Sequence, residues 1–443
     1  MPQKATLTPA TPATTEVSRA DVRRCEAAAM ISELKIRNFK SLESVDLKLG
    51  HFNLLVGANA SGKSNFLDAL RFLQGLGNGL TIDEILNGKP PSSTSLKWDG
   101  IRGGAEFVSY RTKRGLTTST IELEVILKSA RDQNLKYEME FNPSERMFVS
   151  ERLTDGTEIL HEMTREKHKQ QSYENLAIPY VSSSIGNLFA NLHFYDSLRA
   201  NANAQHNSLE KIPDGESRKL KELCWEVLDF FRDMQFLDPL PATLRSYSSK
   251  VLRLGENGEG FAALIHEIES NGSKPALLEW LKELRPDEVD DIYALEGLNN
   301  DFMVAIKEGN KEFRGPVLSE GTLRFIALAA AFFQPSMPKV LVIEEIERGL
   351  HPSRLRLLLE LMRSQSRRTG TQVFATTHSP TLLAWLTEED RKTTFVCTRD
   401  AESGATRMRS LAEVPRLEEL VRERHSLDQL FEQGWIESVL HES

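Results

Sequence analysis

The first regular pattern in the chain is an alternation of apolar and polar positions, which predicts β-strands. It runs through ISELKIRNF, SVDLKL and FNLLVG between residues 31 and 57. From Lys63 the spacing becomes helical, because the apolar residues that follow can share one helix face: Phe66, Leu67, Leu70, Phe72 and Leu73. The stretch GANASGKS therefore lies between a buried strand that ends at Val56 and the start of a helix.

The rest of the chain divides into three sections by its periodicity. Alternation returns in 105–128 and 136–151, for example in TIELEVILK, and predicts a β meander. Residues 151–290 hold amphipathic helical patterns such as ESRKLKELCWEVLDFFRDM. In 291–443, helical and strand patterns alternate, which indicates a mostly parallel sheet with helices on its faces. We therefore predict an α/β fold: a first lobe over 30–150, a mainly helical insertion over 151–290, and a second lobe over 291–443.

Residues 1–29 are rich in Thr, Pro and Ala and contain no apolar segment, so we expect a disordered tail, with translation starting at Met30. No apolar run approaches the roughly 20 residues that a membrane helix needs. Cys25, Cys224 and Cys397 lie far apart without a CxxC pair, which fits a reducing cytoplasm. The formal net charge of -9 argues against a protein that coats nucleic acid through bulk charge.

Gly57-x4-Gly62-Lys63-Ser64 matches the phosphate-loop pattern in full, in the strand-to-helix context that this loop requires. The glycines let backbone N–H groups turn toward phosphates, and the start of the helix adds its positive end. Lys63 is expected to reach the β and γ phosphates, and the Ser64 hydroxyl to bind Mg²⁺. ATP is favoured over GTP, since no Asn/Thr-Lys-x-Asp guanine reader is present. The residues predicted to contact the nucleotide here are Asn59, Ala60, Ser61, Gly62, Lys63, Ser64 and Asn65.

Two carboxylates follow the apolar run in VLVIEEIERGLHP. At the carboxyl end of a central parallel strand they would lie in the crevice where ligands bind, rather than being solvated acids ahead of a helix. Glu344 is expected to hold Mg²⁺, and Glu345 to act as general base on the attacking water. The first of these acids is usually Asp, so the extra methylene of Glu344 shifts the metal by up to ~1.5 Å unless the backbone compensates.

Two further segments can meet phosphate. In LSEGTLR, Ser319 is a good N-cap for the long helix that follows, and Gly321 leaves backbone N–H groups open, so this helix start is a second anion site or an ordinary cap. His378 directly follows the strand pattern in ATTHSPTLL, where a neutral imidazole can reach the γ-phosphate or the attacking water. The alternative for His378 is a structural role.

GANASGKS, LSEGT, LVIEEIERGLHP and TTHS stand in an order that resembles the ABC-type ATPase heads of the RecF, SMC and OLD group, and most closely the stand-alone, OLD-related bacterial AAA-family ATPases. The resemblance covers about residues 31–130 and 290–443. It implies a head-to-head dimer with two MgATP sandwiched between phosphate loop and opposing signature. It further implies that Ser319 and Gly321 touch the partner's γ-phosphate, that Glu345 is the general base, and that His378 is the switch histidine. Arg348–His351 falls where the family's D-loop lies, and no Q-loop glutamine is recognisable.

The predicted function is an ATP-driven switch whose output is an ATP-dependent homodimer or a higher homo-oligomer. It would act in DNA repair, or with a protein effector from a neighbouring gene in anti-phage defence. An OLD-like nuclease is the alternative, although only roughly 60 residues follow THSP, with no EGxxD and no DxD motif. Direct binding to DNA would use the basic clusters at 111–114 and 165–169, which are otherwise solvated faces.

Overall fold

The structure is a computed structural model that describes most of the chain from residue 28 onward. It describes residues 28–91, 97–112, 115, 117–129, 133–156, 158–164, 214–284, 289–415, 417–422 and 426–436. The predicted tail, except for Ala28 and Ala29, therefore lies outside the described residues, and so do Lys113, Arg114 and the basic stretch 165–169.

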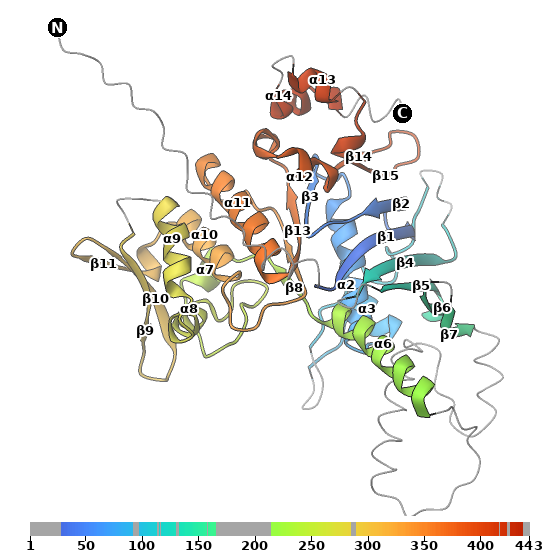
Figure 1. The fold of residues 1–443 in the computed structure, drawn as a ribbon, viewed down its shortest axis with the longest axis horizontal. Coiled ribbons are helices and arrows are strands. Elements are labelled where there is room, and N and C mark those ends of the chain that lie inside the picture. The colour runs from blue at the N-terminus through green and yellow to red at the C-terminus, as the bar shows by residue number, and fades with distance from the viewer. Residues whose placement is uncertain are drawn as a thin grey trace, which may run out of the picture.

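A six-stranded sheet forms the centre of the molecule and joins segments from both ends of the chain (Figure 1). Its order is β15-β14-β3-β13-β12-β8, and every neighbouring pair is parallel except β14 and β15. The strands are β3 (Phe52–Val56), β8 (Met234–Leu237), β12 (Val340–Ile343), β13 (Gln372–Thr377), β14 (Thr394–Arg399) and β15 (Thr406–Ser410). The predicted mostly parallel sheet is confirmed.

The central sheet separates two hydrophobic cores, because successive side chains on each strand point to opposite faces. On β12, Leu341 and Ile343 belong to one core, and Val340 and Val342 belong to the other. All four side chains are fully buried. This double burial explains why the central strands have continuous apolar runs instead of an alternation.

A second six-stranded sheet is entirely antiparallel, with the order β2-β1-β4-β5-β6-β7. Its strands are β1 (Met30–Phe39), β2 (Leu42–Lys48), β4 (Ile121–Lys128), β5 (Asn134–Asn142), β6 (Met147–Asp155) and β7 (Glu158–Thr164). The meander is confirmed, although its part before Ile121 holds isolated bridges such as Arg111–Thr117 rather than a long strand.

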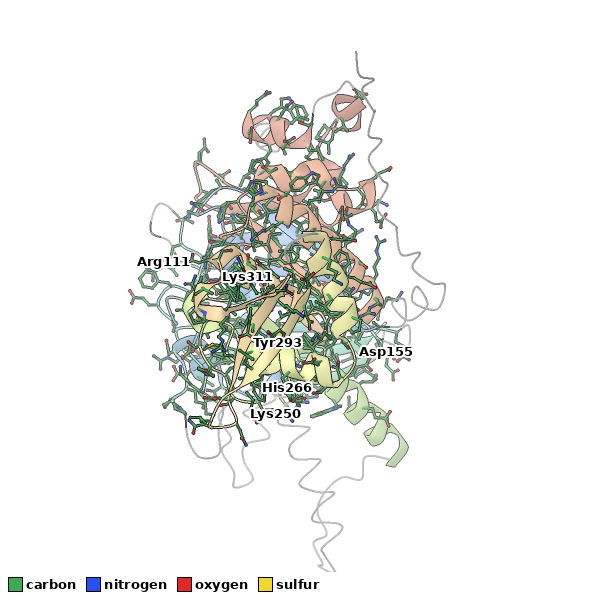
Figure 2. The ribbon with its side chains drawn as sticks, turned by 90° about the vertical axis from the view of Figure 1, so that its left-hand side faces the viewer. Arg111, Asp155, Lys250, His266, Tyr293 and Lys311 are labelled. Atoms are coloured by element: carbon green, nitrogen blue, oxygen red, sulfur yellow. The ribbon has the colours of Figure 1, made fainter. Side chains whose placement is uncertain are left out.

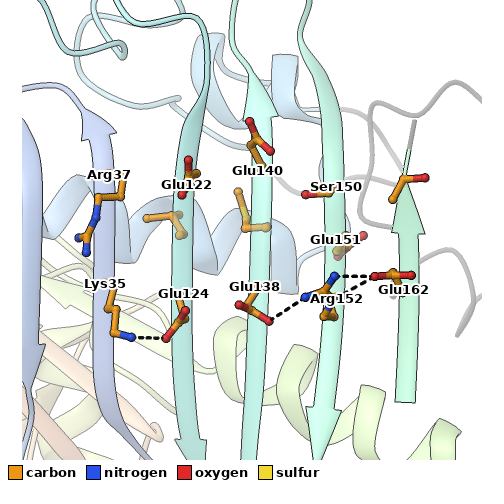
Figure 3. Close-up of a pocket in the computed structure, with 13 residues that line it drawn as sticks. Lys35, Arg37, Glu122, Glu124, Glu138, Glu140, Ser150, Glu151, Arg152 and Glu162 are labelled. Atoms are coloured by element: carbon orange, nitrogen blue, oxygen red, sulfur yellow. Dashed lines mark hydrogen bonds and ion pairs between the residues drawn. The ribbon is translucent and has the colours of Figure 1, made fainter. Parts of the chain in front are cut away.

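The outer face of this antiparallel sheet is a shallow depression of about 240 Å³ lined by charged side chains (Figure 3). Ion pairs join neighbouring strands there, between Lys35 and Glu124 at 2.7 Å and between Arg152 and Glu162 at 2.6 Å. Exposed pairs of this kind contribute only about 0–1 kcal/mol each. The depression includes none of the predicted site residues.

A smaller antiparallel sheet, with the order β11-β10-β9, is separated from the central sheet by helices (Figure 1). It faces the viewer in Figure 2, where Tyr293 and Lys311 are labelled. Its strands are β9 (Asp291–Glu296), β10 (Phe302–Glu308) and β11 (Lys311–Arg314). Helix α8 (Phe261–Ser270) packs on it, and the His266 ring stacks on Phe302 with 4.5 Å between ring centroids.

The remaining helices cover the sheets. They are α2 (Lys63–Gly77), α3 (Ile82–Asn87), α6 (Asp214–Arg232), α7 (Pro241–Leu244), α9 (Lys274–Leu284), α10 (Glu320–Ala330), α11 (Pro352–Thr369), α12 (Glu388–Lys392), α13 (Leu417–Arg422) and α14 (Leu427–Glu432), with 3-10 turns at η1 (Gly315–Val317), η2 (Pro380–Trp385) and η3 (Leu411–Glu413). The apolar face predicted for the helix after Lys63 is buried in α2. The helical pattern PTLLAWLTEED within 291–443 does not form one helix. It forms η2 followed by α12, because Thr387 caps a new helix with Asp390.

In its described residues, the middle section, expected to be mainly helical, contains helices α6, α7, α8 and α9 together with strands that join the two large sheets. Strand β7 extends the meander, and β8 forms the parallel edge of the central sheet next to β12. Helix α6 ends at Arg232, and β8 follows it almost directly with only four residues. A strand this short is too short to produce its own periodic signal in the sequence. The boundaries at 150 and 290 stay predictions.

Candidate functional site

The loop between β3 and α2 is held in a conformation that needs glycine. Gly62 has φ 105°, and a Cβ atom there would lie 2.0 Å from Thr406 Oγ1. A Cβ atom on Gly57 would lie 2.3 Å from the carbonyl oxygen of Cys397. Contacts below about 3 Å between such atoms are not tolerated in packed proteins. The two glycines of the motif are therefore required by the close approach of β14 and β15.

Polar contacts hold this loop from beneath. The Thr406 hydroxyl donates to the carbonyl oxygen of Ser61 at 2.9 Å, and lies 2.6 Å from Ser41 Oγ. The Asn65 amide in turn donates to Ser41 Oγ at 2.6 Å. Asn59 and Ala60 are exposed at the tip of the loop, and Ala60 has a positive φ of 62°. The loop thus presents backbone to solvent while its base is fixed.

Lys63 lies inside the loop and is 4% exposed. Its ammonium group donates to the carbonyl oxygens of Gly57 at 2.6 Å and of Ala58 at 2.9 Å. Burial lowers the pKa of Lys63, and nearby groups including Glu347 and Glu345 oppose this shift. A cation is therefore placed where a phosphate loop would need one.

His378, at the end of β13, connects the loop to the acidic strand end. Its Nδ1 atom lies 3.1 Å from Lys63 Nζ and 3.0 Å from the carbonyl oxygen of Gly57. Its Nε2 atom lies 3.6 Å from Glu345 Oε1. The backbone N–H of His378 donates to Glu347 Oε1, which fixes the start of the turn. Because β3, β13 and β12 are parallel neighbours, their carboxyl ends bring these groups to one edge.

Glu344 lies at this edge and faces a guanidinium group. Arg102 Nη1 lies 3.5 Å from Glu344 Oε2, and Arg102 Nη2 donates to the carbonyl oxygen of Ser64 at 2.8 Å. Arg102 also pairs with the buried Asp68 at 3.0 Å. Burial raises the pKa of Glu344, and the charge of Arg102 opposes that rise. Arg102 therefore bridges the Glu344 carboxylate and the main chain at the start of α2.

Glu345 has an unusual backbone for a residue with a side chain, since its φ is 46°. Its N–H donates to Thr376 Oγ1 at 2.9 Å. Its Oε2 atom accepts from Arg348 Nη2 at 2.7 Å. Left-handed backbone at such a residue costs of order 1–3 kcal/mol and persists only where neighbours hold it, which is common at functional sites.

The LSEGT segment starts α10, and the predicted N-cap is confirmed, because Ser319 Oγ accepts from Thr322 N–H at 3.2 Å. Gly321 is buried, and a Cβ atom there would lie 2.4 Å from the carbonyl oxygen of Gly349. This glycine thus allows α10 to pack against the RGLH turn, a structural role in addition to any phosphate contact. In Figure 1, α10 and α2 lie on opposite sides of the central strands.

The structure brings together Lys63, Ser64, Glu344, Glu345 and His378, but not Ser319 and Gly321. Within the described residues, no hydrogen bond or ion pair joins 318–322 to the loop 57–65. Sequence reasoning missed the groups that hold the site residues: Arg102, Asp238, Glu347 and Thr406. Asp238 follows β8 as Glu344 follows β12, but β8 is only MQFL, which is too short to mark a strand end in the sequence.

The residues fit a nucleotide with its metal. The glycine loop with its inward ammonium group suits phosphate oxygens, and Ser64 with Glu344 would supply two oxygen ligands. Within the described parts of the chain, no three His, Cys, Asp or Glu side chains gather as a metal cluster. Mg²⁺ does not need one, because phosphate and water usually complete its shell. None of the described helices is long and apolar enough to cross a membrane.

The phosphate loop follows an inner parallel strand, and carboxylates and a histidine lie at the ends of the next two strands. This arrangement defines an ABC-type P-loop ATPase of the RecF, SMC and OLD group. Residues 52–384 match the family described as "AAA domain, putative AbiEii toxin, Type IV TA system", and the chain belongs to this family.

Among curated proteins, the chain is similar to an "ATP/GTP phosphatase" of Helicobacter pylori, with 25% identity over 378 residues, or 83% of this chain and 90% of that protein. A 44-residue stretch, 10% of this chain, is 50% identical to the "DNA replication and repair protein RecF" of Glaesserella parasuis, and covers 12% of it. Among solved structures, the chain is similar to an Smc head domain with an extended coiled coil, bound to the C-terminal domain of ScpA, from Pyrococcus furiosus. That match has 14% identity and a TM-score of 0.46, and covers 89% of this chain and 100% of that one.

Proposed function

We propose that this ATPase is a switch that dimerises head-to-head around two MgATP, with each nucleotide held by the loop of one chain and by Ser319 and Gly321 of the other. The observation that carries the proposal is the separation within one chain. Lys63, His378 and Glu345 converge on one edge, whereas the helix start at Ser319 contacts the Gly349 turn instead. A second copy would bring this anion-binding helix start to the phosphates.

Each residue at the edge has a role in this proposal. Lys63 binds the β and γ phosphates, and Ser64 with Glu344 holds Mg²⁺. Glu345 orients and deprotonates the attacking water, and His378 reaches the γ-phosphate from the neighbouring strand. Supporting this assignment, the Glu345 and His378 side chains lie 3.6 Å apart, close enough to bind one water molecule together.

The surface beside Ser319 supports association with another chain. Val317 is 71% exposed and Tyr247 is 51% exposed, and both are apolar or aromatic side chains. Arg245, two residues before Tyr247, donates to the carbonyl oxygen of Leu318, so the two segments are adjacent. Exposed apolar side chains gathered beside a polar motif are typical of an interaction site.

The family description, which names a putative toxin of a type IV toxin–antitoxin system, supports an output directed at a protein partner. We propose that this output serves anti-phage defence, with an effector encoded by a neighbouring gene. The stretch shared with RecF supports a second candidate, DNA repair with direct binding to DNA. We place both activities in the cytoplasm. Stimulation of ATP hydrolysis by duplex DNA at low salt, lost at high salt, would favour the second candidate.

Sedimentation velocity with and without ATP tests the proposed dimer. Wild type should sediment as a dimer with MgATP, and Glu345→Gln should remain a dimer because hydrolysis is slow. Ser319→Trp should bind ATP but stay monomeric. Ser144→Trp, at an exposed position in the β5–β6 turn, is the matched control and should dimerise. A monomeric wild type that hydrolyses ATP at full rate would refute the proposal.

A further inference from the structure

Asp238 lies directly after β8 and its carboxylate joins two arginines from different parts of the chain. Its Oδ1 atom accepts from Arg324 Nη1 at 3.0 Å, and its Oδ2 atom accepts from Arg348 Nη1 at 2.6 Å. Arg324 belongs to α10, five residues after Ser319, and Arg348 belongs to the turn after Glu345. The carboxylate therefore connects the predicted signature helix to the predicted D-loop.

Arg324 also holds the backbone of the acidic strand end. Its side chain is 2% exposed, and its Nη2 atom donates to the carbonyl oxygens of Glu344 at 3.1 Å and of Glu345 at 3.3 Å. Burial lowers the pKa of Arg324, and Asp238 opposes this effect. With Thr376 on the N–H of Glu345, this guanidinium group fixes both sides of the left-handed residue.

Arg348 holds the side chain of Glu345. Its Nη2 and Nε atoms donate to Glu345 Oε2 at 2.7 and 3.0 Å, while its Nη1 atom is taken by Asp238. A guanidinium group is planar, so fixing one nitrogen fixes the direction of the others. Asp238 thus sets the orientation of Arg348, and Arg348 sets that of the Glu345 carboxylate.

We propose that Asp238, Arg324 and Arg348 form a positioning triad that aligns Glu345 for hydrolysis and ties its alignment to the helix that begins at Ser319. The inference rests on the proposed role of Glu345 as general base. Within the described residues, none of the three side chains is hydrogen-bonded or ion-paired to the phosphate loop over 57–65. It acts through Glu345, whose backbone is held by Arg324 and whose carboxylate is held by Arg348.

Asp238→Asn tests the triad, because it keeps the side-chain shape and removes the charge that holds both arginines. The turnover number kcat should fall at least ten-fold, while KM and nucleotide affinity change less than two-fold. Asp238→Glu should restore part of the rate. Asp229→Asn is the matched control, because the Asp229 side chain is 28% exposed, as is that of Asp238. Asp229 pairs with Arg232 and with Lys339, which precedes β12 at the end opposite to Glu344. It should leave kcat unchanged.

A double variant separates positioning from a general structural effect. If Asp238 acts through Glu345, Asp238→Asn should add nothing to the rate loss of Glu345→Gln in single-turnover hydrolysis, because residues that act as a unit are not additive. Arg348→Gln, at a position 46% exposed, should reproduce the effect even if Asp238→Asn folds poorly.

The outcomes keep the triad and the proposed function distinguishable. Normal kcat in both Asp238→Asn and Arg348→Gln, beside an inactive Glu345→Gln, overturns the triad alone. Rate losses that multiply fully in the double variant also overturn it. Wild-type turnover in Glu345→Gln overturns the base assignment and the triad together.

Discussion

Gly62→Ala perturbs the phosphate loop at the point where it lies closest to the rest of the protein. The new methyl group would lie 2.0 Å from Thr406 Oγ1 and 2.7 Å from Thr406 Cγ2. Thr406 is 1% exposed, and its hydroxyl is bonded to the carbonyl oxygen of Ser61, so it cannot turn away freely. The variant must therefore move the loop, the threonine or both.

The magnitude follows from two separate costs. A residue with a side chain at φ 105° is strained by roughly 1–3 kcal/mol. An added methyl group in a packed site costs a further 1–3 kcal/mol or so. We therefore expect Gly62→Ala to lower the free energy of unfolding by about 2–6 kcal/mol. Nucleotide affinity should fall at least ~100-fold, because each displaced N–H bond to a charged phosphate is worth about 1.5–3 kcal/mol.

Urea unfolding followed by circular dichroism, together with equilibrium nucleotide titration, measures both effects. Gly79→Ala is the matched control, because Gly79 also has a positive φ, of 72°, but has no atom within 4 Å of an added Cβ. It should lose only the strain cost, about 1 kcal/mol, and keep nucleotide affinity.

Thr406→Ala, which removes the clashing atoms, should rescue part of the Gly62→Ala defect. Thr406→Ala alone should cost about 1–2 kcal/mol for its lost hydrogen bonds. The double variant should therefore be more stable than the sum of the two single changes predicts. Equal stability losses in Gly62→Ala and Gly79→Ala, or strict additivity in the double variant, would show that the clash is not what requires glycine here.

Three further predictions concern charge in the site. Because burial lowers the pKa of Lys63, nucleotide affinity should fall as the pH rises toward its ordinary value of 10.5, while Lys63→Arg should show no such decline in the same titration. Burial raises the pKa of Glu344, and only the ionised carboxylate binds metal. Mn²⁺ affinity, measured by electron paramagnetic resonance, should therefore fall on acidification while the pH is still above 4.5. The Glu344→Gln variant should abolish this pH dependence. In the absence of nucleotide, Arg102→Ala should raise Mn²⁺ affinity about three- to ten-fold, because it removes the cation that competes for Glu344. Unchanged or weaker Mn²⁺ binding would show that Arg102 does not compete with the metal.

The parts of the fold that could be predicted from the sequence are those with local signals. The loop over 57–64 combines a fixed motif with a change of period, and the apolar run before Glu344 marks an inner strand without any knowledge of its neighbours. His378 could be placed because parallel strands align their carboxyl ends.

The supporting groups could not be predicted, because their roles depend on contacts across long separations in sequence. Arg102 lies in a loop without periodicity, and meets Glu344 at a separation of 242 residues. Thr406 supports Ser61 at a separation of 345 residues. Neither residue type nor spacing indicates such a partner, since arginine and threonine are most often exposed to solvent.

Both carboxylates at the acidic strand end are paired with arginines, Glu344 with Arg102 and Glu345 with Arg348. Two adjacent, partly buried carboxylates would repel each other without such partners, so the arginines neutralise the edge in the absence of a metal. The two pairs differ in what nucleotide binding requires of them. If Ser64 and Glu344 hold Mg²⁺ as proposed, the metal would supply the positive charge that Arg102 supplies here, and Arg102 would have to release Glu344. Arg348 has no such competitor, because Asp238 holds it from the other side. Under the proposed function, the edge would exchange one cation for another at Glu344 while Arg348 keeps the Glu345 carboxylate in place.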